Sequence, residues 1–317
     1  MWFRETFGFE ETDRATVRAQ VIEDGDVIVS RPTGRRMRRG TLDLVSLQAL
    51  RRRAAELPPG RSRTTLSDVT GDIREIHVRP DSAGATFQVA SQVNLLEMPG
   101  SSVTPDAGID GYENDPTQGP ACAIACGAGT LHRNYLVDVD GHKGQTAHRQ
   151  LNAFSGLATA LGISVEVRNG YVWPTRTALA AAARAIAAGD RSELAGNLEI
   201  GVQADTEVTW RHAGHTVTQA YCSALPLAYV RGIPISEWQP LARLVLDAAY
   251  EATLCLAALT AARTGNPATY LTRLGGGAFG NPPAWIDAAI DRALGLAAGY
   301  GLDVRMVTYG PSSGGSR

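Results

Sequence analysis

The segment ATYLTRLGGGAFGNPPAWIDAAIDRALGLAAGYGLDVRMVTYG, residues 268–310, decides the fold class. It opens with a short apolar strand, turns through glycines, continues as a helix over 284–299 and ends in a second strand. A long amphipathic helix over 237–265, with Gly265 at its C-terminal end, precedes it. Strand–helix–strand order predicts an α/β fold with a parallel sheet and helices on both faces. Ligands of such sheets lie at the carboxyl ends of the strands.

Further strands are predicted on both sides of a long loop. Alternating or apolar runs at 73–78, 85–94, 198–203, 207–210 and from 215 onward are typical of strands. Residues 99–120 are rich in Gly, Pro, Ser, Asp and Asn, and loops of this length inside a compact domain are usually functional or disordered.

The glycine loop at 275–281 is the most informative motif. Three successive glycines let the backbone approach a ligand with its amides pointing inward, and the following helix adds positive potential. The sequence is neither a GxGxxG fingerprint nor a P-loop, so we expect a phosphate cradle of another kind. The alternative is a tight strand–helix connection that binds nothing, with Asn281 as the helix cap. A second turn of small residues, QGPACAIACGAG (118–129), favours the cradle, because two cradles suit a diphosphate.

Several motifs occur in the order of a known family. GDI (71–73), ATFQVASQVN (85–94), ACAIACGAG (121–129), YLTRL (270–274), GGGAFGN (275–281) and VTYG (307–310) together resemble a macrodomain. GGGAFGN is especially similar to the loop of the poly(ADP-ribose) glycohydrolase branch. The resemblance implies a macrodomain-like three-layer α/β/α fold with a mostly parallel mixed sheet, which recognises ADP-ribose. The resemblance does not cover the first 60 residues or residues 140–200.

The resemblance also implies roles for particular residues. Asp72 would accept a hydrogen bond from the adenine amino group, Asn94 would contact the distal ribose and Tyr309 would stack on adenine. The alternatives are a turn residue, a strand-end cap and a core side chain, respectively. Residues 119–123 and 275–280 would be the two phosphate loops. The predicted ligand contacts are Asp72, Ile73, Gln118, Gly119, Pro120, Ala121, Cys122, Gly275, Gly276, Gly277, Ala278, Phe279, Gly280, Asn281 and Tyr309.

Two departures from the family affect the expected chemistry. Ala121 stands where macrodomain hydrolases of the mono-ADP-ribosyl type place an aspartate, and the paired glutamates of the glycohydrolase branch are absent in their usual form. Cleavage of a glycosidic bond needs a general acid or base. Glu97, three residues after Asn94, is the first candidate, and Glu113 and Asp115 follow. We expect a hydrolase that removes ADP-ribosyl groups from protein or nucleic acid with no metal or cofactor; the alternative is a non-catalytic reader of ADP-ribose or a related nucleotide.

Composition limits the remaining possibilities. The 317 residues are 44% hydrophobic and 20% charged, which excludes a disordered chain, and the net charge of −2 gives no global attraction to nucleic acid or membrane. We expect no membrane span and no signal peptide. The four cysteines favour the reducing cytoplasm, and the pair Cys122 and Cys126 is interpreted as buried small residues.

The chain is predicted to have three parts. These are an arginine-rich N-terminal extension (1–64), the α/β domain (65–310) with an insertion at about 140–200, and a flexible tail (311–317). Within the extension, residues 31–63 hold ten arginines against only Asp43 and Glu56, a local charge of +8. They form either a solvated face or a nucleic-acid patch. The ten are Arg31, Arg35, Arg36, Arg38, Arg39, Arg51, Arg52, Arg53, Arg61 and Arg63.

Overall fold

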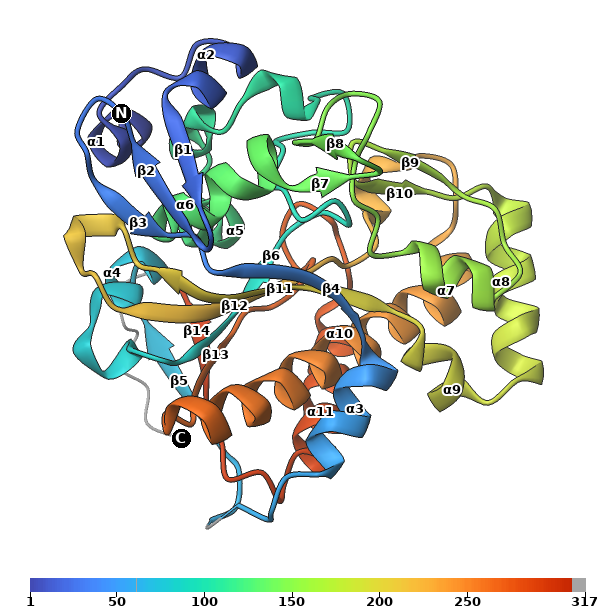
Figure 1. Cartoon of the computed structure of the whole chain (residues 1–317). Coiled ribbons are helices and arrows are strands. Elements are labelled where there is room, and N and C mark those ends of the chain that lie inside the picture. Colours follow the sequence, from blue (N-terminus) through green and yellow to red (C-terminus); the bar gives the residue numbers. More distant parts are fainter. Residues whose placement is uncertain (61, 310–317) are drawn as a thin grey trace.

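The computed structural model describes residues 1–60 and 62–309. A seven-stranded mixed sheet has the order β4-β11-β12-β6-β13-β14-β5 (Figure 1). Its strands are β4 (Thr41–Ser46), β5 (Thr65–Thr70), β6 (Thr86–Ala90), β11 (Glu199–Glu207), β12 (Thr216–Cys222), β13 (Ala268–Leu271) and β14 (Asp303–Thr308). Only β11 runs against the others, because it pairs antiparallel with both neighbours while the remaining pairs are parallel. The predicted α/β class with a mostly parallel mixed sheet is confirmed.

Helices cover both faces of this sheet (Figure 1). One layer contains α3 (Leu47–Ala55), α8 (Arg176–Ala188), α9 (Arg191–Gly196), α10 (Ile235–Thr264) and α11 (Pro283–Leu296). The other contains α4 (Ile73–Val78), α5 (Gln118–Ala125), α6 (Gly127–Leu131) and the π-helix η4 (His132–Leu136).

Smaller elements surround these layers. N-terminal to β4 are α1 (Trp2–Phe7), α2 (Arg14–Ala19), β1 (Val21–Asp24), β2 (Val27–Ser30) and β3 (Arg36–Arg38). Beyond η4 are β7 (Asp138–Val139), β8 (His142–Lys143), α7 (Ser155–Ala160), β9 (Glu166–Arg168) and β10 (Tyr171–Trp173). Short 3₁₀ turns are η1 (Pro80–Ser82), η2 (Pro105–Ala107), η3 (Asp110–Asn114), η5 (Trp210–His212) and η6 (Leu227–Tyr229).

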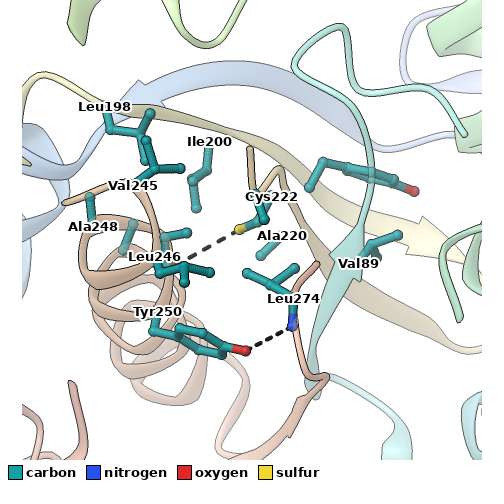
Figure 2. Close-up of a cluster of buried hydrophobic side chains, with 14 of the residues drawn as sticks. Val89, Leu198, Ile200, Ala220, Cys222, Val245, Leu246, Ala248, Tyr250 and Leu274 are labelled. Atoms are coloured by element: carbon teal, nitrogen blue, oxygen red, sulfur yellow. Dashed lines mark hydrogen bonds between the residues drawn. The ribbon is translucent and has the colours of Figure 1, made fainter. Parts of the chain in front are cut away.

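The core lies between α10 and the sheet. Figure 2 shows Val245, Leu246 and Ala248 of α10 facing Ile200 of β11 and Ala220 of β12, all of them buried. Contrary to the expectation from the sequence, α10 contains a window with the length and hydropathy of a membrane span, but 89% of that window is buried inside the molecule. α10 is therefore a core helix here.

One polar contact joins this core to the glycine loop. The Tyr250 hydroxyl on α10 accepts a hydrogen bond from the amide of Leu274 (2.8 Å; Figure 2). It also donates one to the carbonyl of Thr272 (2.7 Å). The chain leaving β13 is thus fixed by a buried side chain before it reaches Gly275.

The predicted segment 73–78 is helical, not extended. Asp72 caps α4 by accepting a hydrogen bond from the amide of Arg74 (2.9 Å), and Ile73, Ile76 and His77 are buried. Their spacing of three and four residues marks one face of a helix. The strand prediction was wrong because Asp72 was not recognised as a helix cap.

Two predicted boundaries also need correction. Residues 41–46 are not part of a separate extension, because β4 pairs with β11 as an edge strand of the main sheet. The predicted strand at 198–203 is the first part of β11, which continues to Glu207 past a bulge between Gln203 and Thr206. The predicted strand at 207–210 was wrong, because only Glu207 is extended in the sheet and Trp210 begins the turn η5. Within the predicted insertion at about 140–200, residues 140–198 add no strand to the main sheet, and β11 begins at Glu199. The tail at 311–317 lies outside the described residues.

Candidate active site

A cavity of about 530 Å³ opens at the carboxyl edge of the sheet. Its walls come from the segments that follow β5, β14, β13, β6 and β12, which are the five neighbouring parallel strands. This is where ligands of parallel α/β sheets bind, and the volume is typical of a small-molecule site. The predicted residues that line it are Asp72, Ile73, Glu97, Glu113, Asp115, Gln118, Gly119, Pro120, Ala121, Gly275, Gly277, Ala278, Phe279 and Tyr309.

Asp72 and Tyr309 lie at the β5 end of the cavity. Asp72 forms an ion pair with Arg74, whose Nη2 is 2.6 Å from Oδ2. Burial opposes ionisation of Asp72, but the hydrogen bonds and charge of Arg74 prevail and hold its pKa below the usual value. Tyr309 is 74% exposed, so its ring is available to a ligand and is not a core side chain. The sequence did not identify Arg74, which shares this end of the site.

The glycine loop forms the wall that follows β13. Gly275 and Gly280 have φ of 68° and 74°, in the left-handed region that favours glycine. Among the residues that the structure describes, no protein group accepts a hydrogen bond from the amides of Gly277, Ala278 or Phe279. Free amides on cavity-lining residues next to the 14-residue helix α11 suit an anionic ligand.

Asn281 closes this loop and does not cap the helix. Its Nδ2 donates to the carbonyl of Leu225 (2.9 Å) and to that of Gly275 (3.3 Å). α11 begins at Pro283, with Pro282 at the capping position. Asn281, Gly276 and Gly280 do not line the cavity but shape the loop that does.

The predicted first phosphate loop is the first turn of α5. Thr117 is the N-terminal cap residue, so Gln118 and Gly119 present unpaired amides at a helix start. The Gln118 side chain ties this turn to β6, accepting from the amide of Ala90 (3.0 Å) and donating to the carbonyl of Gln88 (2.7 Å). Cys122 lies behind this turn, fully buried and away from the cavity.

Glu97 is held by a compact turn after β6. The Gln92 side chain closes the turn by bonding both the amide (2.8 Å) and the carbonyl (3.2 Å) of Met98. The amide of Glu97 donates to the Tyr112 hydroxyl (3.1 Å). Only 1% of the Glu97 side chain is exposed, and that side chain lines the cavity.

Burial dominates the electrostatics of Glu97. Loss of hydration raises the pKa of Glu97 from 4.5 to about 8, although the charge of Arg133 and the nearby Tyr112 hydroxyl oppose the rise. Neither carboxyl oxygen has a hydrogen-bond partner among the described residues. Glu97 is therefore largely protonated at neutral pH and can donate a proton to a bound molecule.

The other two carboxylate candidates serve the cavity wall. Glu113 accepts a hydrogen bond from the amide of Trp2 (3.2 Å), and Asp115 accepts one from the amide of Thr117 (2.9 Å). Both line the cavity. Each already has a structural partner, so Glu97 remains the first candidate for proton transfer.

Asn94 lies outside the cavity lining. It is fully buried; its Nδ2 donates to Gln150 (2.9 Å) and its Oδ1 accepts from the amide of Leu96 (3.1 Å). As the structure stands, Asn94 shapes the turn that carries Glu97, and its predicted contact with a ribose stays a prediction.

An aromatic cluster at the Glu97 end of the cavity was not foreseen. Tyr171, Tyr229 and Phe279 lie with ring centroids 4.9–5.6 Å apart. The Tyr171 hydroxyl donates to the carbonyl of Met98 (2.8 Å). Tyr171 comes from the segment 140–200, so this segment contributes directly to the site. No motif in the sequence links these three positions, which only the fold brings together.

The remaining predictions concern metals, cysteines and arginines. Among residues 1–60 and 62–309, no cluster of three His, Cys, Asp or Glu side chains is placed to hold a metal ion. All four cysteines are free and buried, as predicted for Cys122 and Cys126. Four of the ten arginines at 31–63 form ion pairs with acids: Arg35 with Glu207, Arg36 with Asp24, Arg38 with Asp26 and Arg51 with Glu251. These pairs favour the structural interpretation over a nucleic-acid patch.

The fold and cavity define an α/β protein with a small-molecule site at the carboxyl edge of its sheet. Free backbone amides on one wall of this site suit an anionic group. No protein-family model matches the sequence, and no curated protein matches it. Among solved structures, the chain is similar to poly(ADP-ribose) glycohydrolase from Deinococcus radiodurans in complex with ADP-ribose, at 14% identity and a TM-score of 0.44, over 85% of this chain and 87% of that chain. It is also similar to the enzyme from Thermomonospora curvata, at 14% identity and a TM-score of 0.43, over 99% and 94%. The function proposed below rests on the site of this chain.

Proposed function

We propose that this chain binds an ADP-ribosyl group in the cavity and hydrolyses its glycosidic bond. The observation that carries the proposal is the position of Glu97, a buried carboxylic acid in the cavity that also contains the free amides of the glycine loop. The amides of Gly277, Ala278 and Phe279 and those at the start of α5 would bind the diphosphate. Asp72 with Arg74, and the Tyr309 ring, would receive the base.

The reaction uses Glu97 twice. Its carboxyl group donates a proton to the oxygen or nitrogen that leaves the anomeric carbon of the ribose, and the glycosidic bond breaks. Water then forms the new bond to that carbon, and the Glu97 carboxylate accepts the proton that water releases. The acid is restored, and the products are free ADP-ribose and the released protein or nucleic-acid group. A pKa near 8 suits the first step at neutral pH.

Calorimetric titration with ADP-ribose, with AMP and ribose 5-phosphate as controls, tests the binding. Micromolar affinity for ADP-ribose and much weaker affinity for both controls would support the two-part site.

Product analysis with mono- and poly-ADP-ribosylated substrates tests the chemistry. Glu97→Gln keeps the shape of the side chain and should lower the rate by roughly 100-fold or more while ADP-ribose still binds. Equal turnover by Glu97→Gln would remove Glu97 from the mechanism.

A second function, that of a reader of ADP-ribose, is favoured by two observations. The Glu97 side chain is only 1% exposed, and Ala121 supplies no carboxylate at the cavity wall. A reader would bind ADP-ribose with the same affinity and give no product with any ADP-ribosylated substrate. For either function we propose the cytoplasm as the compartment, because all four cysteines are free.

A further inference from the structure

Arg133 is a fully buried cation directly behind Glu97. It belongs to the π-helix η4, and its side chain has no exposed surface. The guanidinium carbon lies 3.8 Å from the centroid of the Tyr221 ring. Nη2 donates to the Thr130 hydroxyl (3.1 Å) and is 3.8 Å from Oε1 of Glu97. An uncompensated charge at such a depth is costly, so its position near a carboxyl group needs a reason.

Arg133 also supports the turn that carries Glu97. Its Nε donates to the carbonyl of Leu95 (3.0 Å). Leu95 has a φ of 64°, a left-handed conformation that a leucine adopts only when its surroundings enforce it. The side chain of Leu95 packs against Gly201 of β11, where a Cβ atom would be 2.5 Å away. Arg133 and Gly201 therefore fix this residue from two sides.

The guanidinium does not line the cavity. A bound molecule meets Glu97 first, and Arg133 lies on the far side of the carboxyl group. Nη1 of Arg133 and both oxygens of Glu97 lack hydrogen-bond partners among the described residues. The two side chains face one another at 3.8 Å, which leaves the carboxyl group free to turn toward a ligand.

We propose that Arg133 is a positioning residue for Glu97, which holds the Glu97 turn through the carbonyl of Leu95 and presents one fixed positive charge to the back of the carboxyl group. The proposal rests on the function proposed for Glu97. It assigns Arg133 no contact with substrate.

The fixed charge controls the protonation of Glu97. The groups that face Glu97 are Arg133 from η4, Tyr112 from η3, Tyr221 from β12 and Cys122 from α5. Burial raises the pKa of the two tyrosines and of the thiol, so all three are neutral in the neutral pH range. Arg133 is the group that carries charge, and it lowers the pKa of Glu97 against the effect of burial. Without Arg133, Glu97 would hold its proton to a higher pH.

The experiment is a titration of Glu97 in the ligand-free protein. Carbon-13 NMR of carboxyl-labelled glutamate, with Glu97→Gln for assignment, gives the midpoint directly. Arg133→Met should move the midpoint upward by about one to three pH units, the usual effect of a neighbouring charge. Arg133→Lys keeps the charge and should leave the midpoint within a fraction of that shift. An unchanged midpoint in folded Arg133→Met would overturn the proposal.

Arg14→Met is the matched control. Arg14 also lies over an aromatic ring, 5.0 Å from the centroid of Tyr135, and also donates to carbonyls, those of Asn134 and Pro105. It does not face Glu97, so its loss should not move the Glu97 midpoint.

If Arg133→Met does not fold, Thr130→Val tests the same contact, because it removes one partner of Nη2 and frees the guanidinium to approach Glu97. The Glu97 midpoint should then fall or stay, and a rise would contradict the proposal.

Activity separates this proposal from the proposed function. If the protein hydrolyses ADP-ribosyl bonds, Arg133→Met should move the descending limb of the kcat profile to higher pH with little change in affinity for ADP-ribose. If the protein hydrolyses nothing, the proposed function fails, while the NMR midpoints still decide whether Arg133 controls Glu97.

Discussion

Gly119 of α5 lies against Ala90 at the end of β6, so close that a Cβ atom at position 119 would be 1.9 Å from the Ala90 carbonyl oxygen. No side chain fits in that space. The approach brings the start of α5 next to the turn that carries Glu97, whose Cγ would be 3.2 Å from the same Cβ atom. Two walls of the cavity thus meet at one glycine.

Gly119→Ala should therefore destabilise the protein and weaken ligand binding. We expect a loss of about 1–3 kcal/mol in the free energy of unfolding, because backbone must move to admit the methyl group. Denaturant unfolding measures it. Gly295→Ala is the control: Gly295 is also helical, but nothing lies within 4 Å of its Cβ position. That variant should be about 0.5–1 kcal/mol more stable than the wild type. Equal stability of the two variants would contradict the packing argument.

Asn281→Asp should open the glycine loop. The aspartate places a charged acceptor where Nδ2 now donates to the carbonyls of Leu225 and Gly275. We expect a loss of about 1–3 kcal/mol in stability and at least a tenfold weaker affinity for ADP-ribose. Asn266→Asp is a matched control, since Asn266 donates to two carbonyls, those of Asp81 and Ala83, outside the cavity. Calorimetry should show that Asn266→Asp leaves the affinity for ADP-ribose unchanged. A similar loss of affinity in both variants would show that the glycine loop has no specific part in binding.

Glu97 should make stability fall as pH rises. Its pKa is about 8 in the folded protein and near the ordinary 4.5 when unfolded, so the folded state binds the extra proton between these values. The stabilisation is complete below pH 4.5 and is lost progressively toward pH 8. Glu97→Gln lacks this proton equilibrium, so it should gain stability relative to the wild type from pH 5 to pH 8. Urea unfolding at both pH values measures the change.

Glu251 should contribute to stability with the opposite dependence on pH to that of Glu97. Burial alone would raise its pKa, but ion pairs with Arg51 and Arg292 hold the pKa below the usual value. Its stabilisation is present above the unfolded pKa and is lost as pH falls through the folded one. Glu251→Gln should cost stability at pH 7 and cost less in acid. Glu97→Gln and Glu251→Gln should therefore change the dependence of stability on pH in opposite directions. A change in the same direction would contradict the environments assigned to the two glutamates.

Glu11 should control the order of the cavity wall at 109–115. Its carboxylate accepts hydrogen bonds from the amides of Ile109 (2.8 Å) and Asp110 and from the hydroxyl of Tyr135 (2.6 Å). Glu11→Ala should raise hydrogen exchange at Ile109 and Asp110 by roughly tenfold or more, since a charged hydrogen bond contributes about 1.5–3 kcal/mol. Glu10→Ala, which removes only a surface ion pair with Arg4, should leave exchange there unchanged. Unchanged hydrogen exchange in Glu11→Ala would show that residues 109–115 are ordered without Glu11.

The sequence predicted the fold class, because strand periodicity and glycine turns are local properties, and it named 14 of the 33 residues that line the cavity. The glycine loop was found for the same reason, whereas Glu97 was chosen because it follows Asn94, a position set by the family resemblance, and its catalytic role stays a prediction. The helix at 73–78 was missed because its cap, Asp72, had been interpreted only as a ligand contact. Arg133 was missed although it is the only Asp, Glu, Lys or Arg between Pro120 and Val137. Its role depends on Glu97 lying opposite, and only the tertiary structure shows that.

The strand β4 has a consequence for how the gene can be shortened. A chain that began at Thr65 would keep the residues that line the cavity, since the first of them is Gly71. It would also leave β11 without its partner from Thr41 to Ser46 and expose a row of unpaired backbone groups along the nine-residue strand. Such an edge pairs readily with another copy of itself. The strand at 41–46, which does not line the cavity, would then decide whether the protein stays in solution or aggregates.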